Sequence, residues 1–171
     1  ADDLGKSVPF DEFYQAMQQG AETKTSQVNA EEFEAYFETF LREGKDILHV
    51  SLSSALSGVM NSAMIARENL AVRYPRQKIF LVDSLGASSG YGLLMDKLAD
   101  LRDQGEKIEA VYEWAEEHKL NLHHWFFSTD LTFYIKGGRI SKTAGAIGGL
   151  LNICPLLNMD SRGCLTPRFK I

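Results

Sequence analysis

The first part of the chain carries apolar residues at the three- and four-residue steps typical of amphipathic helices. One such series lies between Pro9 and Gln18, and a second runs from Phe33 to Leu41. Asn29 precedes the second series and Gly44 follows it, which are common residues at the start and end of a helix. The pattern therefore predicts two helices joined by the polar stretch from Gly20 to Gln27.

Short apolar runs farther along the chain are typical of buried parallel strands. They cover Asp46 to Leu52 and Lys78 to Val82. Each run leads through a turn rich in Ser and Gly into a helical pattern, from Met60 to Leu70 after the first and from Leu93 to Leu101 after the second. Two strand-turn-helix units in series predict a parallel sheet.

The pattern changes after a further helix and an aromatic strand, which are predicted over Lys107 to Lys119 and Leu122 to Phe127. Two short helices and a β-hairpin are expected beyond them. Their predicted ranges are Leu131 to Lys136, Thr143 to Leu150, and Leu156 to Lys170 with its turn at Asp160 to Gly163. We predict an α/β fold, with a parallel-sheet domain over residues 1–130 and the start of a second α+β domain over 131–171.

Composition and charge narrow the classes of function. The chain is 44% hydrophobic and 24% charged, with a net charge of −5 and singly scattered Lys and Arg residues. No basic stripe is present to bind a phosphate backbone, so nucleic acid is not an expected partner. The longest apolar runs are too short to cross a bilayer, and a cytoplasmic protein is expected.

The two cysteines, Cys154 and Cys164, lack the spacing of metal ligands. We expect them to be reduced, partly buried thiols. No metal and no cofactor are predicted.

Hydroxyl side chains follow both predicted parallel strands. The first serine loop, Ser53–Gly58, contains Ser53, Ser54 and Ser57, and the second serine loop, Asp83–Gly90, contains Ser84, Ser88 and Ser89. Loops at the carboxyl ends of parallel strands are where α/β proteins bind ligands, and helix N-termini there favour anions. Serines at such positions also serve as helix caps. We favour capping for the second loop and anion binding for Ser53 and Ser54.

Two other segments could add to an anion site. Thr25 and Ser26 lie in the polar loop between the first two helices. Arg139 directly follows Gly137 and Gly138, a setting suited to bidentate capture of a carboxylate or phosphate. An exposed Arg that interacts with the C-terminus of a helix explains this residue equally well.

His49 lies in the first predicted strand, close in sequence to the first serine loop. It could act as a general base, but a strand histidine between Leu48 and Val50 is more often a core residue. None of the four histidines is spaced as a metal-binding pair.

Five motifs in order carry a resemblance to a known family. They are Lys24-Thr25-Ser26-Gln27, Leu52-Ser53-Ser54-Ala55-Leu56-Ser57-Gly58, Val82-Asp83-Ser84, Gly137-Gly138-Arg139-Ile140-Ser141 and Asn152-Ile153-Cys154-Pro155. Together they resemble the DegV family across nearly the whole chain. Each motif is weak alone, but the order of all five is specific.

The resemblance implies a two-domain protein that buries a long-chain fatty acid between its domains and serves as the binding subunit of a bacterial fatty acid kinase system. The kinase is a separate protein, and the binding subunit has no catalysis of its own. The resemblance implies that Thr25 and the Ser53-Ser54 pair hold the carboxylate and that Arg139 assists at the mouth of the site. With the neighbouring hydroxyls of Ser26 and Ser57, these residues form the expected ligand set.

Departures from the family pattern concern single residues and both ends of the chain. Val28 and Asn29 replace the usual Pro and Ser, and Ala55 replaces the usual Gly, but the hydroxyl groups remain. Family members open with a strand and an Asp-Ser-Ser loop, and close with further strands and helices. We expect both to be missing here, and residues 1–24 to pack against the second domain.

Two other functions use the same loops. A serine acyl hydrolase would use Ser53 or Ser54 as nucleophile and His49 as base, although the chain lacks a G-x-S-x-G elbow. A binding protein for a small phosphorylated metabolite is the second alternative, without a G-x-G-x-x-G or P-loop motif.

Overall fold

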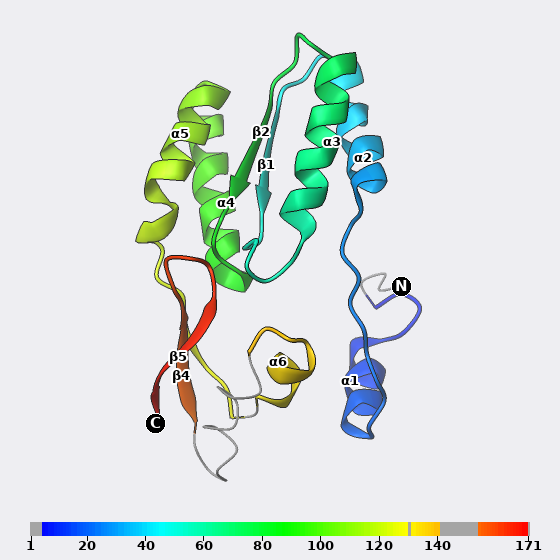
Figure 1. Ribbon diagram of the computed structural model, residues 1–171, viewed down its shortest axis with the longest axis vertical. Helices are drawn as coiled ribbons and strands as arrows, with labels where there is room; N and C mark the ends of the chain where they lie inside the picture. The colour runs from blue at the N-terminus through cyan, green and yellow to red at the C-terminus, as the bar shows by residue number, and fades with distance from the viewer. Residues whose placement is uncertain (1–4, 130, 141–153, 171) are drawn as a thin grey trace.

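The computed structural model describes residues 5–129, 131–140 and 154–170. Figure 1 shows a layered α/β part above a smaller antiparallel sheet, with the first helix standing apart from both. The elements are α1 (Phe10–Gln18), α2 (Ala30–Arg42), β1 (Ile47–Ser51), α3 (Val59–Arg73), β2 (Ile79–Asp83), α4 (Ser88–Asp103), α5 (Ile108–His118), the 3-10 helix η1 (Lys119–Asn121), β3 (Trp125–Phe127), α6 (Thr132–Lys136), β4 (Pro155–Met159) and β5 (Leu165–Lys170).

The predicted parallel sheet is confirmed, with β1 and β2 paired from Ile47 opposite Ile79 to Ser51 opposite Asp83. Helices α2 and α3 lie on one side of these strands and α4 and α5 on the other (Figure 1). A separate apolar cluster fills each side. The first is centred on Phe33, Phe37, Leu41, Ala63, Ala66, Leu70 and Leu81, and the second on Val50, Val82, Leu94, Leu98, Val111 and Ala115. The two strands are thus covered on both faces, as parallel sheets usually are.

The predicted hairpin is also confirmed, since β4 pairs antiparallel with β5. Strand β3 joins the other edge of β4, with Trp125 opposite Asn158. One face of this sheet packs against the α6 segment through a small cluster built on Leu131, Ile140 and Leu157. The predicted helix at 143–150, together with Ser141 and Asn152-Ile153, lies outside the described residues. The division into two domains at residues 130 and 131 stays a prediction.

Local sequence signals explain two helix boundaries. Asn29 accepts a hydrogen bond from the backbone N–H of Glu32 at 2.9 Å, and Glu32 accepts one from the N–H of Asn29 at 2.9 Å. This capping box starts α2 where the sequence placed it. Helix α4 begins at Ser88, five residues before the predicted start at Leu93. Ser and Gly have low helix propensity, so the local sequence does not predict this first turn.

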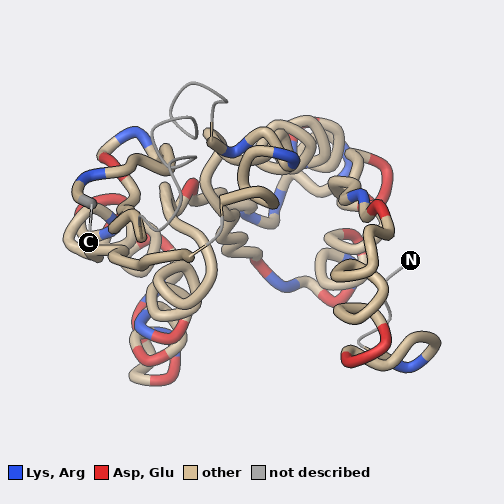
Figure 2. Tube along the Cα trace, turned by 90° about the horizontal axis from the view of Figure 1, so that it is seen from below, with Lys and Arg blue, Asp and Glu red and all other residues tan. Residues whose placement is uncertain are grey.

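Helix α1 has no buried residue, and Phe10 and Tyr14 are 55% and 59% exposed. The polar stretch that follows it leads up to α2 along one side of the molecule (Figure 1). The expected packing of residues 1–24 against a second domain stays a prediction. Figure 2 shows Lys and Arg positions scattered among acidic ones along the chain rather than gathered in one stripe.

Candidate functional site

The two serine loops lie side by side at the carboxyl ends of β1 and β2. The backbone N–H of Ser53 donates to the carbonyl oxygen of Gly86 at 2.9 Å, and the N–H of Ser84 donates to that of Ser51 at 3.1 Å. Parallel pairing of the strands brings their exit loops to the same edge. The two serine loops are therefore neighbours at the edge of the sheet where the sequence predicts the site.

Ser53 joins the first serine loop to the distant hairpin. Its side chain is fully buried, and its hydroxyl donates to the carbonyl oxygen of Gly163, in the β4–β5 turn, at 2.7 Å. The Ser53 hydroxyl oxygen also accepts the backbone N–H of Ala55 at 3.2 Å. Because the hydroxyl proton is committed to Gly163, Ser53 acts here as an anchor between segments. The sequence pattern gave no sign of this contact.

Ser54 and Ser57 differ from Ser53 in their surroundings. Ser54 is exposed, and its backbone N–H donates to the Asp83 carboxylate at 3.2 Å, which also accepts the N–H of Leu85 at 3.1 Å. Asp83 therefore holds both serine loops. The Ser57 hydroxyl accepts the backbone N–H of Val59 at the start of α3, at 3.3 Å, which leaves its own proton able to donate.

Arg139 reaches the first serine loop from the end of α6. Its Nε donates to the carbonyl oxygen of Leu56 at 3.2 Å, and its Nη1 donates to the carbonyl oxygen of Gly137. Gly138 adopts a positive φ of 75° just after the helix, which turns the chain so that Arg139 can fold back. The contact with Gly137 agrees with the interpretation of Arg139 as a residue at a helix end, and its capture of a carboxylate or phosphate stays a prediction.

Thr25 and Ser26 are exposed, and Gln27 beside them ties their loop to the start of α3. The Gln27 Nε2 donates to the Ser62 hydroxyl at 3.3 Å. A Cβ at Gly58 would lie 2.7 Å from the Gln27 Oε1, so a larger residue there would require the Gln27 side chain to shift. In the sequence Gln27 is one position of the Lys24–Gln27 motif, and only the fold gives it a linking role.

The hydroxyls of the second serine loop do not cap α4, and that of Ser84 bonds within the loop. The Ser84 hydroxyl accepts the N–H of Gly86 at 3.2 Å, within a turn. Helix α4 has Ala87 as its N-cap and no side-chain cap, so the predicted capping role of Ser88 and Ser89 is wrong. The backbone fold of this loop, with Ser88 at a positive φ of 52°, leaves the cap position to Ala87.

His124 of the segment before β3 occupies the space beside the second serine loop. Cβ atoms added at Gly86 and Gly90 would lie 2.6 Å and 2.0 Å from its ring. Burial lowers the pKa of His124, and a hydrogen bond with the Ala87 backbone partly offsets this effect. The neutral imidazole is therefore the form that fits against these glycines.

His49 is a core residue, as the sequence favoured. Its ring contacts Phe33 and Phe37, with ring centroids 5.1 Å and 5.4 Å away. Within the described part of the chain its buried Nε2 has no hydrogen-bond partner, and burial lowers its pKa. With the Ser53 proton directed to Gly163, the described contacts do not assemble the serine-histidine pair that a hydrolase needs.

Two cavities lie near the strands. A cavity of about 790 Å³ runs along β1 and the two residues before it, from Lys45 to Val50. It lies between the aromatic face of α2 on one side and α5 and α4, which contributes Tyr91, on the other. Among the residues that the structure describes, none of the six expected ligand residues lines it. A smaller cavity of about 330 Å³ lies between His124 and the β4–β5 hairpin.

Other expectations concern thiols, metals and membranes. Cys154 and Cys164 are free and half-buried, as predicted. Within residues 5–129, 131–140 and 154–170, no group of three or more potential metal ligands occurs. No helix in that same part of the chain has both the length and the apolar character to cross a bilayer.

Comparisons with known proteins agree on one family. A family model described as an uncharacterised protein of the DegV family matches residues 3–171. A DegV domain-containing protein of Clostridium perfringens is 43% identical over 151 residues, which is 88% of this chain and 52% of that protein. Another from Lactococcus lactis is 35% identical, over 91% of this chain and 54% of the relative. The chain spans about half the length of the curated relatives it matches.

Solved structures with this fold are described by a bound fatty acid or by fatty acid binding. The fatty acid kinase B3 protein of Streptococcus pneumoniae, loaded with linoleic acid, is 32% identical with a TM-score of 0.83, covering 96% of this chain and 58% of its own. A DegV family protein from Thermus thermophilus, described by its fatty acid binding, is 29% identical with a TM-score of 0.80, covering 94% and 55%. A DegV family protein from Ruminococcus gnavus, refined with vaccenic acid, is 26% identical with a TM-score of 0.84, covering 97% and 58%.

Proposed function

Because this chain belongs to the DegV family, we propose that it is a fatty-acid-binding carrier that buries one acyl chain between two domains. The observation that carries the proposal is that three solved relatives, 26%, 29% and 32% identical to this chain, are described by the fatty acids they bind. The protein would present the lipid carboxylate to a separate kinase for acyl-phosphate formation. The fatty acid is the ligand, and no other cofactor is proposed.

The carboxylate would bind beside the first serine loop. Ser54 is exposed there, Ser57 keeps a proton to donate, and Arg139 contacts the loop at Leu56. Thr25 and Ser26 would add hydroxyls from the segment that Gln27 ties to α3. In this proposal the buried Ser53 holds the loop in place rather than binding the carboxylate, because its hydroxyl already donates to Gly163.

Affinity would come mainly from the acyl chain. Burying a dozen methylene groups contributes about 10 kcal/mol before the cost of ordering the lipid. Hydrogen bonds from the hydroxyls would then fix the position of the carboxylate, each contributing about 1.5–3 kcal/mol when the acceptor is charged. Hydrophobic burial would thus supply binding and the loop would supply orientation.

The role toward a kinase rests on the Streptococcus pneumoniae relative, which is named as a fatty acid kinase B protein. Phosphoryl transfer to a carboxylate depends on positioning and charge neutralisation more than on covalent help from the protein. Arg139, at the mouth of the site, would neutralise charge there. In this proposal the kinase partner supplies the catalysis, and both proteins act in the bacterial cytoplasm.

The first test is mass spectrometry of small molecules extracted gently from the purified full-length protein. We expect one free fatty acid per protein, and its mass would identify the chain length and unsaturation. Recovery of no lipid, together with no uptake of added oleate or palmitate, would contradict the carrier function.

Substitutions test the site separately from the function. Thr25→Ala and Ser54→Ala should each weaken fatty acid binding at least tenfold, because each removes a hydrogen bond to a charged group. Both residues are exposed, so the melting temperature should stay unchanged. Thr23→Ala and Ser89→Ala are matched controls, exposed residues near the same segments, and should bind as the unchanged protein does. Full binding by both test variants would exclude this carboxylate site while leaving the carrier function open.

A further inference from the structure

The smaller cavity brings Lys119 and two histidines together with Arg168 of β5. It lies between the stretch from η1 to β3 and the β4–β5 hairpin, and its volume is about 330 Å³. Lys119, His123 and His124 line it from one side, and Arg168 and Asn158 line it from β5 and β4. This grouping stands out because the chain as a whole has a net charge of −5.

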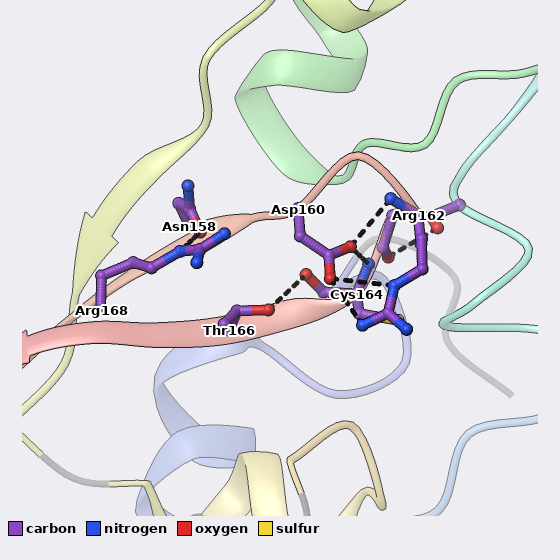
Figure 3. A network of polar contacts seen from close by, with 8 residues as sticks. Asn158, Asp160, Arg162, Cys164, Thr166 and Arg168 are labelled. Carbon is purple, nitrogen blue, oxygen red and sulfur yellow. Dashed lines mark hydrogen bonds and ion pairs between the residues drawn. The ribbon is translucent and has the colours of Figure 1, made fainter.

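Arg168 is oriented but not neutralised by its described contact. Its Nε donates to the Asn158 Oδ1 at 2.7 Å, as Figure 3 shows. The amide is uncharged, so this hydrogen bond orients the exposed guanidinium without neutralising its positive charge. A guanidinium held in this way can offer its Nη groups to an anion as a preformed fork.

The acidic group that lines this cavity is already satisfied. Asp160 accepts the backbone N–H groups of Arg162 and Cys164 at 2.9 Å and 3.0 Å, and it pairs with the Arg162 guanidinium at 3.1 Å (Figure 3). These contacts lower its pKa, with the Cys164 N–H as the largest cause. Asp160 therefore carries its own counter-ion and weakens the positive character of the cavity little.

Lys119 contributes a second, largely buried cation. Its side chain is 14% exposed, and its Nζ pairs with Glu116 at 2.7 Å, whose side chain is 38% exposed. Glu116 does not line the cavity, whereas Lys119 does. Lys119 therefore brings a cation to the cavity wall whose counter-ion, Glu116, lies outside the lining.

We propose that this cavity is a binding site for a small molecule bearing a phosphate group, held by Arg168 and Lys119 with His123 at the rim. Phosphate is favoured over a carboxylate because a tetrahedral group offers oxygens to cations arriving from different directions. The volume is at the lower end of the range for small-ligand pockets. This site is separate from the proposed fatty acid site, although His124 borders the cavity and also contacts the second serine loop.

The test is a titration of the full chain with inorganic phosphate, measured by isothermal titration calorimetry at constant ionic strength. We expect saturable binding that weakens at least tenfold in Arg168→Gln and in Lys119→Gln. Arg102→Gln removes the same charge at an exposed position on α4 and should bind phosphate normally. Acetate at equal concentration should bind at least tenfold more weakly than phosphate.

Several outcomes would overturn the proposal. They are an absence of saturable phosphate binding, equal binding by Arg168→Gln and Arg102→Gln, or equal binding of acetate and phosphate. Circular dichroism of each variant checks the fold, and Arg168→Lys, which keeps the charge but loses the fork, should give intermediate affinity. Because no lipid enters the experiment, its result is independent of the fatty acid proposal.

Discussion

The two serine loops begin alike in sequence and differ in how the rest of the molecule meets them. Both follow a parallel strand, and both contain three serines. The first loop is joined from afar through Ser53 to Gly163 and through Leu56 to Arg139. The second loop instead bonds within itself through Ser84 and receives the ring of His124. Similar motifs at one sheet edge can thus acquire different roles from their neighbours.

The largest expected effect comes from breaking the contact between the first loop and the hairpin. In Gly163→Ala the new Cβ would lie 2.1 Å from the Ser53 Oγ, at a φ of 74°. Positive φ costs an alanine about 1–2 kcal/mol, and overpacking adds about 1–3 kcal/mol. Gly138→Ala has nearly the same φ, 75°, and nothing within 4 Å of its Cβ. Urea unfolding should show a clearly larger loss for Gly163→Ala, and equal losses would mean that the contact is weak.

The second loop offers a similar test at its contact with His124. In Gly90→Ala the Cβ would lie 2.0 Å from the His124 Nδ1, which predicts a loss of about 1–3 kcal/mol in the free energy of unfolding. Gly92→Ala lies on the same helix with nothing within 4 Å, so it should stabilise the protein by up to about 1 kcal/mol. Thermal unfolding of Gly90→Ala and Gly92→Ala measures both changes in stability. Stabilisation of both variants would refute the close contact with His124.

Removing one buried hydroxyl from each loop should separate a long-range bond from a local one. Ser53→Ala leaves the Gly163 carbonyl without its donor and should lower the free energy of unfolding by about 1–3 kcal/mol. It should also speed hydrogen exchange in the 160–164 turn. Ser84→Ala removes bonds to Gly86 alone and should leave that turn unaffected. Exchange mass spectrometry measures both, and equal exchange in the turn would argue against the anchor.

The last predicted effect is a dependence of stability on pH. Burial lowers the pKa of both His124 and His49 in the folded protein. As the pH falls below about 6.5, the unfolded chain therefore binds protons that the folded chain does not, and the free energy of unfolding falls by at most about 1.4 kcal/mol per pH unit for each histidine. The fall should level off below the folded-state pKa values.

Denaturant titrations between pH 7.5 and pH 5 would measure this slope. His124→Gln and His49→Gln should each flatten it, and only His124→Gln should change exchange in the second serine loop. An unchanged slope in both variants would show that these rings do not stay neutral in the fold.

Much of the fold could be predicted because it follows local patterns. The apolar runs placed β1 and β2 within one residue of their ends, and Asn29 with Glu32 marked the start of α2. Prediction failed at the first turn of α4, where Ser and Gly have low helix propensity. For the site, the motifs indicated that the first serine loop and Arg139 could belong to one anion site. They did not reveal Gln27, Asp83, His124 or Gly163 as the residues that hold the loops.

The sequence by itself determined the elements, their order and the edge of the sheet where hydroxyls gather, because periodicity and turn residues act over a few positions. It also carried the family resemblance. Only the tertiary structure decided which serine is an anchor and which is exposed, because Ser53 and Gly163 are 110 residues apart. No local pattern encodes a contact between such distant segments. Burial and hydrogen bonding there depend on which backbone group reaches the loop when the chain is folded.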